Sequence, residues 1–438
     1  MRWIDIDLAD PQHRRAAAPL LDRAAARAAA VPSLQERTGV DSPAVTREIL
    51  ATGQLLWQAV LAVDPFAFSP ARDYAGGVDP CVGVAENDHG HGYHFVVAPQ
   101  DLTLPWSWLH NGPGFLLAHY PLAAGTTGTW AALGAPTRAW MGRHRDALLA
   151  ELVQGRVPAA RRSERAGAAA ARILFLAGHC EPTVRPLLYR EAEAIDDALG
   201  AAALAPALAA LWVPDQAIAP GALTRPDGGW QAVHFAGPTS RPPAAEAEEP
   251  WSALAQTGWA DGVDAPESTD EPLSFEEVGE LELVGVDPIS ALLDQVAARA
   301  AHRAGPAPDG AHLATPPVRA AERPRWLLDD GPVHPEDLGR AGGAPPLVFS
   351  NSYLSLPGLG PRFLAAGAST FVGPVAAVLS GPAREFAARF YGCLGDGWST
   401  AAALRGAALA CRDHYGEEHP TWLSYGLIGH GCLALQYL

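Results

Sequence analysis

Lysine is absent from this chain of 438 residues, so all 31 basic residues are arginines, against 48 Asp and Glu and a formal charge of −17. Proteins that bind nucleic acid without sequence preference rely on basic side chains to neutralise phosphates. An acidic chain without lysine is poorly suited to that task, so we expect no nucleic-acid partner. The bias toward arginine fits codon usage in a GC-rich genome, but avoidance of lysine-directed modification predicts the same composition.

Cysteine is also scarce, and no two cysteines form a CxxC pair. The five are Cys81, Cys180, Cys393, Cys411 and Cys432. Their spacing supports neither a zinc knuckle nor a disulfide framework. His89 and His91 stand two residues apart in a Gly-rich stretch, but no matching set of further ligands lies nearby, which favours a surface turn. We therefore expect no metal and no other cofactor.

Long apolar runs are missing as well. No stretch of eighteen or more apolar residues could span a membrane, and the opening MRWIDIDLADPQHRR lacks the apolar region of a secretory signal. The chain is nevertheless 48% hydrophobic and 18% charged, which is typical of a protein with a folded core. We expect a reduced, soluble, cytoplasmic protein without a membrane partner.

The apolar spacing predicts the order of secondary structure. Helical periodicity covers residues 11–31 and 43–63, and from residue 172 short apolar runs alternate with helical patterns. This alternation is typical of a mostly parallel central sheet covered by helices on both faces, an α/β three-layer α/β/α fold. We expect strands at 81–85, 93–98, 172–177, 231–236, 326–328, 346–350, 369–373 and 422–428, and helices at 136–153, 187–199, 359–366, 382–394 and 399–415.

One segment differs from the rest in charge. Residues 242–298 contain no Arg and fourteen Asp or Glu, so they carry −14 of the net −17. Such self-repelling composition predicts a mobile insertion, within which residues 289–301 could form a helix. Docking to a basic partner surface is the alternative role for this segment.

Four consecutive segments in the last part of the chain carry a family resemblance. They are PLVFSNSYLS (346–355), PRFLAAGASTFVGP (361–374), REFAARFYGCLGDGWSTAAALRGAALACRD (384–413) and PTWLSYGLIGHG (420–431). In this order they resemble the third core strand, a helix–strand step, the paired helices and the closing strand of a CHAT domain. This family has the bacterial caspase-like peptidase fold of clan CD.

The resemblance extends toward the N-terminus. The matching segments are LTLPWSWLHNGPGFLLAHYPL (102–122), RILFLAG (172–178) with LLYREAEAIDDALG (187–200), WQAVHFAG (230–237) and WLLDDGPVHPEDL (326–338). In the first of them, Ser107 stands where the family usually has Glu. The resemblance implies a CHAT domain over residues 45–438, interrupted by the acidic insertion at about 242–322, after an N-terminal helical segment of residues 1–44.

The two positions that carry the family's chemistry depart from its pattern. Active members continue HFAG with His–Gly, and that His is the general base, whereas this chain reads HFAGPTS and places Pro238 there. The nucleophilic Cys aligns with Tyr353, or with Ser352 if the loop slips by one residue. Proline cannot accept a proton, and a phenol with a pKa of about 10 is a weak nucleophile without a strong neighbouring base.

Two pairs of residues could replace the lost centre. His179 and Cys180 are adjacent at a strand end, but successive side chains of a strand point to opposite faces. Ser352 could be activated by His234, but active relatives carry a His at that position without using it as the base. Ordinary structural roles are the favoured interpretation for all four residues, and a core histidine satisfied by a neighbour is the favoured one for His234.

These observations lead to three hypotheses. The first is a catalytically inactive pseudo-peptidase, a scaffold or regulator whose protein partners could be an active protease, a sensor or an effector of the same bacterial defence or cell-death module. The second is an active peptidase with Ser352 or Cys180 as nucleophile. The third is a structural subunit that uses the helices of residues 1–63, and it predicts an exposed apolar stripe on them.

Overall fold

The structure is a computed structural model of the chain. It describes residues 2–68, 91–127, 171–180, 185–202, 209–212, 230–237, 324–328, 331–340 and 343–433. The chain divides into two compact units, residues 1–244 with 322–438 and residues 245–321, and the described residues all belong to the first. Outside them lie Pro238, the acidic insertion with its expected helix, the expected strand 81–85 and the expected helix 136–153.

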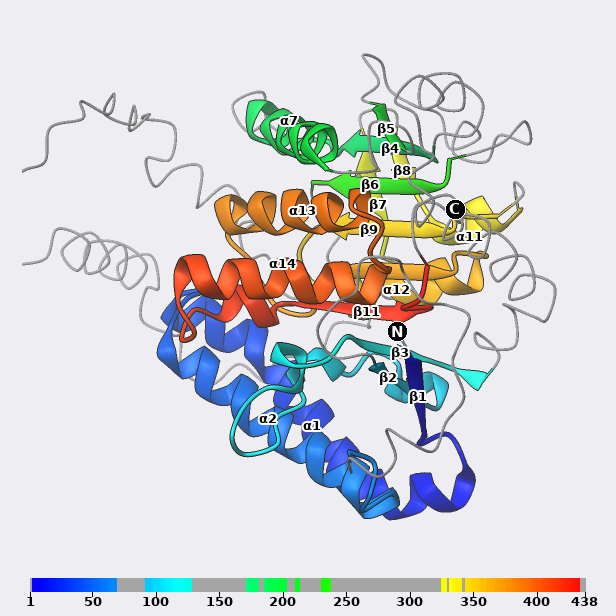
Figure 1. The fold of residues 1–438 in the computed structure, drawn as a ribbon, viewed down its shortest axis with the longest axis vertical. Helices are drawn as coiled ribbons and strands as arrows, with labels where there is room; N and C mark the ends of the chain where they lie inside the picture. The colour runs from blue at the N-terminus through cyan, green and yellow to red at the C-terminus, as the bar shows by residue number, and fades with distance from the viewer. Residues whose placement is uncertain are drawn as a thin grey trace, which may run out of the picture. The chain divides into compact units, whose positions relative to one another are not determined.

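A nine-stranded sheet forms the centre of this unit, in the order β1-β2-β3-β11-β10-β9-β6-β4-β5 (Figure 1). All neighbouring strands run parallel except β10 and β11, which are antiparallel. The strands are β1 (Arg2–Asp7), β2 (His91–Val96), β3 (Leu122–Gly125), β4 (Ala171–Ala177), β5 (Ala209–Trp212), β6 (Ala232–Ala236), β9 (Leu347–Asn351), β10 (Thr370–Pro374) and β11 (Tyr425–Gly429). The mostly parallel sheet predicted from the sequence is confirmed.

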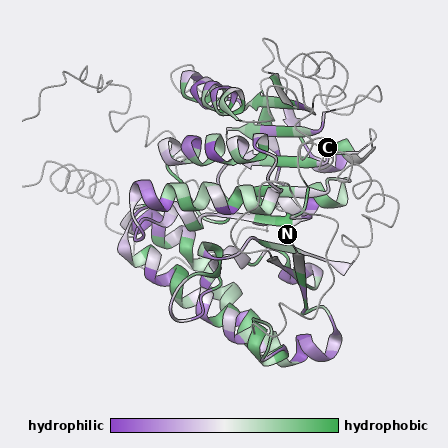
Figure 2. Ribbon diagram, in the orientation of Figure 1, coloured by the Kyte–Doolittle hydropathy of each residue, from purple (hydrophilic) through white to green (hydrophobic). Residues whose placement is uncertain are grey.

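Helices cover both faces of the sheet. On one face α7 (Arg185–Ala201), α13 (Ser380–Gly395) and α14 (Thr400–Tyr415) lie side by side (Figure 1). The other face carries α12 (Ser355–Ala365), α11 (Pro335–Arg340) and the hairpin of β7 (Trp326–Leu328) and β8 (Gly331–Val333). Every residue of β6, β10 and β11 is buried, which is typical of strands covered on two faces. Figure 2 shows mostly hydrophobic residues on these strands, whereas the helices carry both hydrophobic and hydrophilic residues.

The N-terminal region belongs to the same unit and contributes a strand as well as helices. β1 forms one edge of the sheet and leads into the hairpin of α1 (Pro11–Thr38) and α2 (Pro43–Val63). Gln35 at the end of α1 is buried, and its amide pairs with the backbone of Ala377 through bonds of 2.8 and 3.1 Å. The expected helical segment of residues 1–44 is therefore not structurally separate from the sheet that follows.

The exposed side of this hairpin does not have the surface that the structural-subunit hypothesis requires. The buried face of α1 includes Leu21, Ala24 and Val31, and that of α2 includes Ile49 and Leu56. Among the described residues, the large hydrophobic side chain that is exposed is Phe66, which follows α2. The predicted apolar stripe on the helices is absent from the described part of the chain.

Candidate functional site

The carboxyl edge of β4, β6 and β9 is where the resemblance places its catalytic centre. The three strands are parallel neighbours, so their carboxyl ends meet at one edge of the sheet. Ligand sites of open α/β sheets lie at such edges. β11 runs in the opposite direction, because it pairs antiparallel with β10, and so its first residue, Tyr425, reaches the same edge.

The backbone at this edge is tightly packed. Gly237, directly after β6, has φ +148°, and a Cβ atom placed on it would lie 2.6 Å from the Cα of Gly178. Only glycine fits such an approach. After β9, Leu354 has φ 49° and ψ 32°, the left-handed conformation that non-glycine residues seldom adopt. The chain therefore turns sharply between β9 and α12, directly after Ser352 and Tyr353.

Four buried or partly buried side chains form a polar network on the α7/α13 face of this edge. Glu191 Oε1 on α7 accepts hydrogen bonds from His234 Nε2 at 2.6 Å and from Asn351 Nδ2 at 2.7 Å. The Tyr425 hydroxyl donates to Asn351 Oδ1 at 2.6 Å. The network therefore ties together α7, β6, β9 and β11, and it satisfies polar groups that would be costly to bury alone.

Aromatic rings enclose this network. The imidazole of His234 is fully buried and stacks between Phe175 and Phe349, at centroid distances of 5.1 and 4.8 Å. Burial, and secondly the nearby charge of Glu191, raise the pKa of Tyr391 and of Tyr425 well above the ordinary phenol value. Both tyrosines therefore stay protonated at neutral pH, and Tyr425 remains a donor. His234 has the structural environment that the sequence favoured for it.

A second cluster, made of hydroxyl groups, lies on the α12 face. Ser350 Oγ accepts a hydrogen bond from Trp326 Nε1 at 3.0 Å and lies 2.9 Å from Ser352 Oγ. The hydroxyl of Ser355 donates to the carbonyl of Ser350 at 2.8 Å. Ser350 and Ser352 are both buried, so the Ser352 hydroxyl is held inside the protein by a neutral neighbour.

The sheet separates Ser352 from His234. His234 pairs with Phe349 and Phe235 with Ser350 across β6 and β9, so His234 and Ser350 point to opposite faces. His234 contacts α7, whereas Ser350 bonds to Trp326 of β7, and Ser352 lies beside Ser350. A nucleophile and its base must come within hydrogen-bond reach. The structure does not bring this suggested pair together.

The other candidate residues lie at the same edge. His179 and Cys180 follow β4; the His side chain is exposed, the thiol is partly buried, and the His179 N–H donates to the Leu327 carbonyl at 2.7 Å. β6 stands between their strand and β9, which precedes Ser352. Tyr353 is partly buried in the turn before α12.

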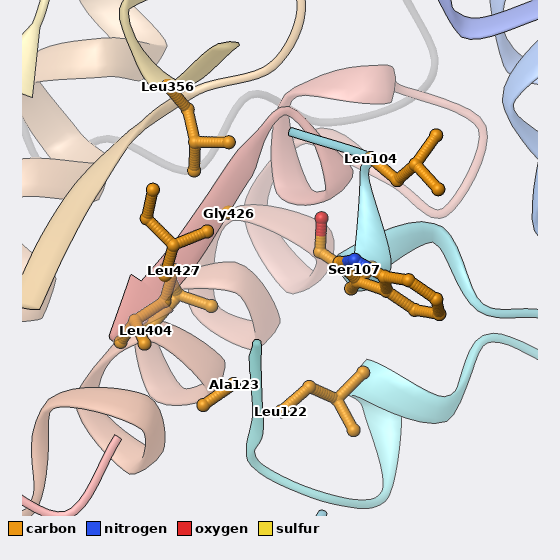
Figure 3. A pocket seen from close by; sticks show the side chains of 10 residues that line it. Leu104, Ser107, Leu122, Ala123, Leu356, Leu404, Gly426 and Leu427 are labelled. Carbon is orange, nitrogen blue, oxygen red and sulfur yellow. The ribbon is translucent and has the colours of Figure 1, made fainter. Parts of the chain in front are cut away.

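A small cavity lies away from this edge, between β3 and β11 (Figure 3). The cavity has a volume of ≈ 10 Å³ that the centre of a water molecule can occupy. Its lining side chains are apolar except for that of Ser107, a residue of the short 3-10 helix η2 (Trp106–Trp108). Besides Ser107, its lining residues include Leu104, Leu122, Ala123, Leu356, Leu404, Gly426 and Leu427.

No cluster of three or more metal-ligating side chains occurs in the residues that the structure describes. His89 lies outside them, and His91 is the first residue of β2. In the same residues, none of the helices combines the length and apolarity needed to cross a bilayer.

Sequence reasoning missed Glu191, Asn351 and Tyr425, which complete the network around His234. For Glu191 a signal was present, because it shares a helix face with Ile195 and Leu199 at spacings of four and eight residues. A charged residue on an apolar face needs a buried partner. Asn351 and Tyr425 carry no comparable signal, because their meeting depends on the antiparallel pairing of β10 with β11.

Comparisons with known proteins add no relative to this description: no family model and no curated protein matches the chain.

Proposed function

We propose that the chain is a catalytically inactive caspase-like protein that acts as a protein-binding scaffold or regulator. The observation that carries the proposal is the separation of Ser352 from His234 by the sheet. In the sequence, Pro238 and Tyr353 stand at the positions of the base and the nucleophile of the family that the chain resembles. Losing both together argues against peptidase chemistry more strongly than losing either alone.

The polar network supports a binding role for the same edge. Glu191 holds His234 in a buried hydrogen bond, and the bonds to Asn351 and Tyr425 join the ends of β9 and β11 to α7. A rigid edge of this kind suits recognition, since little conformational entropy is lost when a partner binds. By its resemblance to CHAT proteins, the partner is a protein of a bacterial defence or cell-death module.

A peptide-library retention experiment tests the proposal. The full chain is immobilised and incubated with a mixed peptide library, and both the bound and unbound fractions are sequenced by mass spectrometry. We expect a reproducible set of intact peptides in the bound fraction and no new peptide termini. The Ser352→Ala chain, which keeps the polar network, should retain the same set.

Two results would contradict the proposal. New termini that disappear with Ser352→Ala or Cys180→Ala would identify a nucleophile and an active peptidase. A bound fraction no different from that of bare resin would remove the support for peptide recognition.

A second experiment tests whether the acidic segment contributes to partner binding. With fourteen carboxylates in residues 242–298, it would attract a basic partner surface over a range set by ionic strength. If it takes part, deleting residues 243–300 should weaken partner capture at low salt and have little effect at high salt. Equal capture by both chains at low salt would show that the segment is not used.

A further inference from the structure

The cavity between β3 and β11 contains an unusual hydroxyl group. Ser107 is 5% exposed, and within the described part of the chain its Oγ has no hydrogen-bond partner. Its two neighbours in η2 are both satisfied, since Trp106 Nε1 donates to the Asp101 carbonyl and Trp108 Nε1 to the Leu423 carbonyl. Figure 3 shows Ser107 among the residues that line the cavity.

The sheet ladder stops at the same place. β3 and β11 pair through one residue pair, Ala124 with Ile428. Two residues earlier the ladder would pair Leu122 with Gly426, and both of these residues line the cavity instead. The cavity therefore occupies the position of the missing rung.

Leu122 directs its backbone polar groups toward this gap. The carbonyls of Pro121 and Gly125 accept bonds from β2 and the residue after it, so these two residues face β2. Backbone groups alternate in direction along a strand, and Leu122, like Ala124, consequently faces β11. A water at the missing rung would have the Leu122 backbone on one side and the Ser107 hydroxyl on the other.

We propose that this cavity is a binding site for one water molecule, which the Ser107 hydroxyl and the Leu122 backbone hold and which completes the contact between β3 and β11. The cavity volume that the centre of a water molecule can occupy is ≈ 10 Å³, which is at the lower limit for holding one water. Buried waters bond to about three polar groups, as this position allows. The water joins the β1–β2–β3 part of the sheet to the rest of it.

A crystal structure of the full chain at a resolution of about 1.8 Å or better tests the site directly. We expect one ordered water at hydrogen-bond distance, about 2.7–3.0 Å, from Ser107 Oγ, and its loss in Ser107→Ala. An empty cavity would overturn the proposal. So would a Ser107 hydroxyl that donates directly to a protein carbonyl.

Urea unfolding of Ser107→Ala provides a second test, with Ser424→Ala as the matched control. Ser424 is also buried, and its hydroxyl donates to the Pro420 carbonyl at 2.9 Å. If Ser107 holds a water, each substitution should lower the folding equilibrium constant by about 3- to 10-fold. A dry, unpartnered hydroxyl predicts the opposite for Ser107→Ala, an unchanged or higher constant, because removing it relieves a desolvation cost.

Discussion

The polar network depends on the carboxylate of Glu191, because one of its oxygens accepts hydrogen bonds from both His234 and Asn351. Glu191→Ala leaves one buried donor, on His234, and one partly buried donor, on Asn351, without an acceptor. We expect it to lower the free energy of unfolding by about 2–4 kcal/mol, measured by urea denaturation.

The matched control is Glu193→Ala, because Glu193 is exposed two residues along the same helix. Its effect should stay within about 0.5 kcal/mol. Equal losses for the two substitutions would contradict the importance of the network.

The buried thiols give a prediction about pH. Burial raises the pKa of Cys393 to about 11 and that of Cys411 to about 12, from 9.0. Well below pH 9 both thiols are protonated in the folded and unfolded states and give stability no pH dependence. Above pH 9 the unfolded chain loses protons that the folded chain keeps, so stability should fall as pH rises toward 11.

The fall has an upper limit of about 1.4 kcal/mol per pH unit for each thiol. Unfolding by urea at pH 7, 9 and 10 measures it, and the Cys393→Ala/Cys411→Ala chain should show a smaller decline. An identical decline in the two chains would assign the pH dependence to other groups, such as Tyr415, whose pKa is raised to about 12.

The residues of the candidate site were predictable only in part. Pro238 and Tyr353, the positions at which the resemblance places the base and the nucleophile, could be located from the sequence, because each follows a strand with a recognisable apolar pattern. That Ser352 and His234 point to opposite faces depends on the register of β6 against β9, which no pattern in one strand determines. The sequence alone therefore could not decide whether Ser352 and His234 lie within reach of each other.

Among the structural elements, the turn from β9 into α12 carries a local backbone strain. Leu354 has φ 49°, a conformation that Asn tolerates and that β-branched residues strongly disfavour. Leu354→Val should therefore be less stable than Leu354→Asn by about 1–2 kcal/mol in urea denaturation. If the Val chain is as stable as the Asn chain, the turn does not hold this conformation.

Helix α1 offers a test of whether the N-terminal region folds with the sheet. Gln35→Ala removes two bonds to the Ala377 backbone and should cost about 1–3 kcal/mol, with one cooperative transition for the whole described unit. The control is Gln12→Ala, on the exposed first turn of the same helix. A separate early transition for α1 and α2 in Gln35→Ala would indicate an independent segment.

Most elements with a long periodic pattern were predicted correctly. The range expected for the second helix, residues 43–63, coincides with α2, and the strands at 172–177 and 346–350 match β4 and β9 to within one residue. β1, β3, β5, β8 and the short helix α11 were missed. β3 and β5 are four residues long, too short for a clear pattern, and β1 alternates at the sheet edge next to a charged helix start.

At the scale of the whole molecule, two parallel groups of strands meet at the antiparallel pair β10–β11. This change of direction is what brings Tyr425 to the carboxyl end of β9. The site therefore depends on the assembly of both groups, and it combines residues that are 234 positions apart in the chain, from Glu191 to Tyr425.

The central claim is that the edge of the sheet carrying Ser352, His234 and Cys180 has no peptidase chemistry. Digestion of a multiplexed peptide library by the purified full chain, read by mass spectrometry with and without lysate of the native host, tests it most directly. The account predicts that wild type, Ser352→Ala and Cys180→Ala give the same peptide termini in both conditions. Cleavage by the wild type that either substitution abolishes would contradict it and would name the nucleophile.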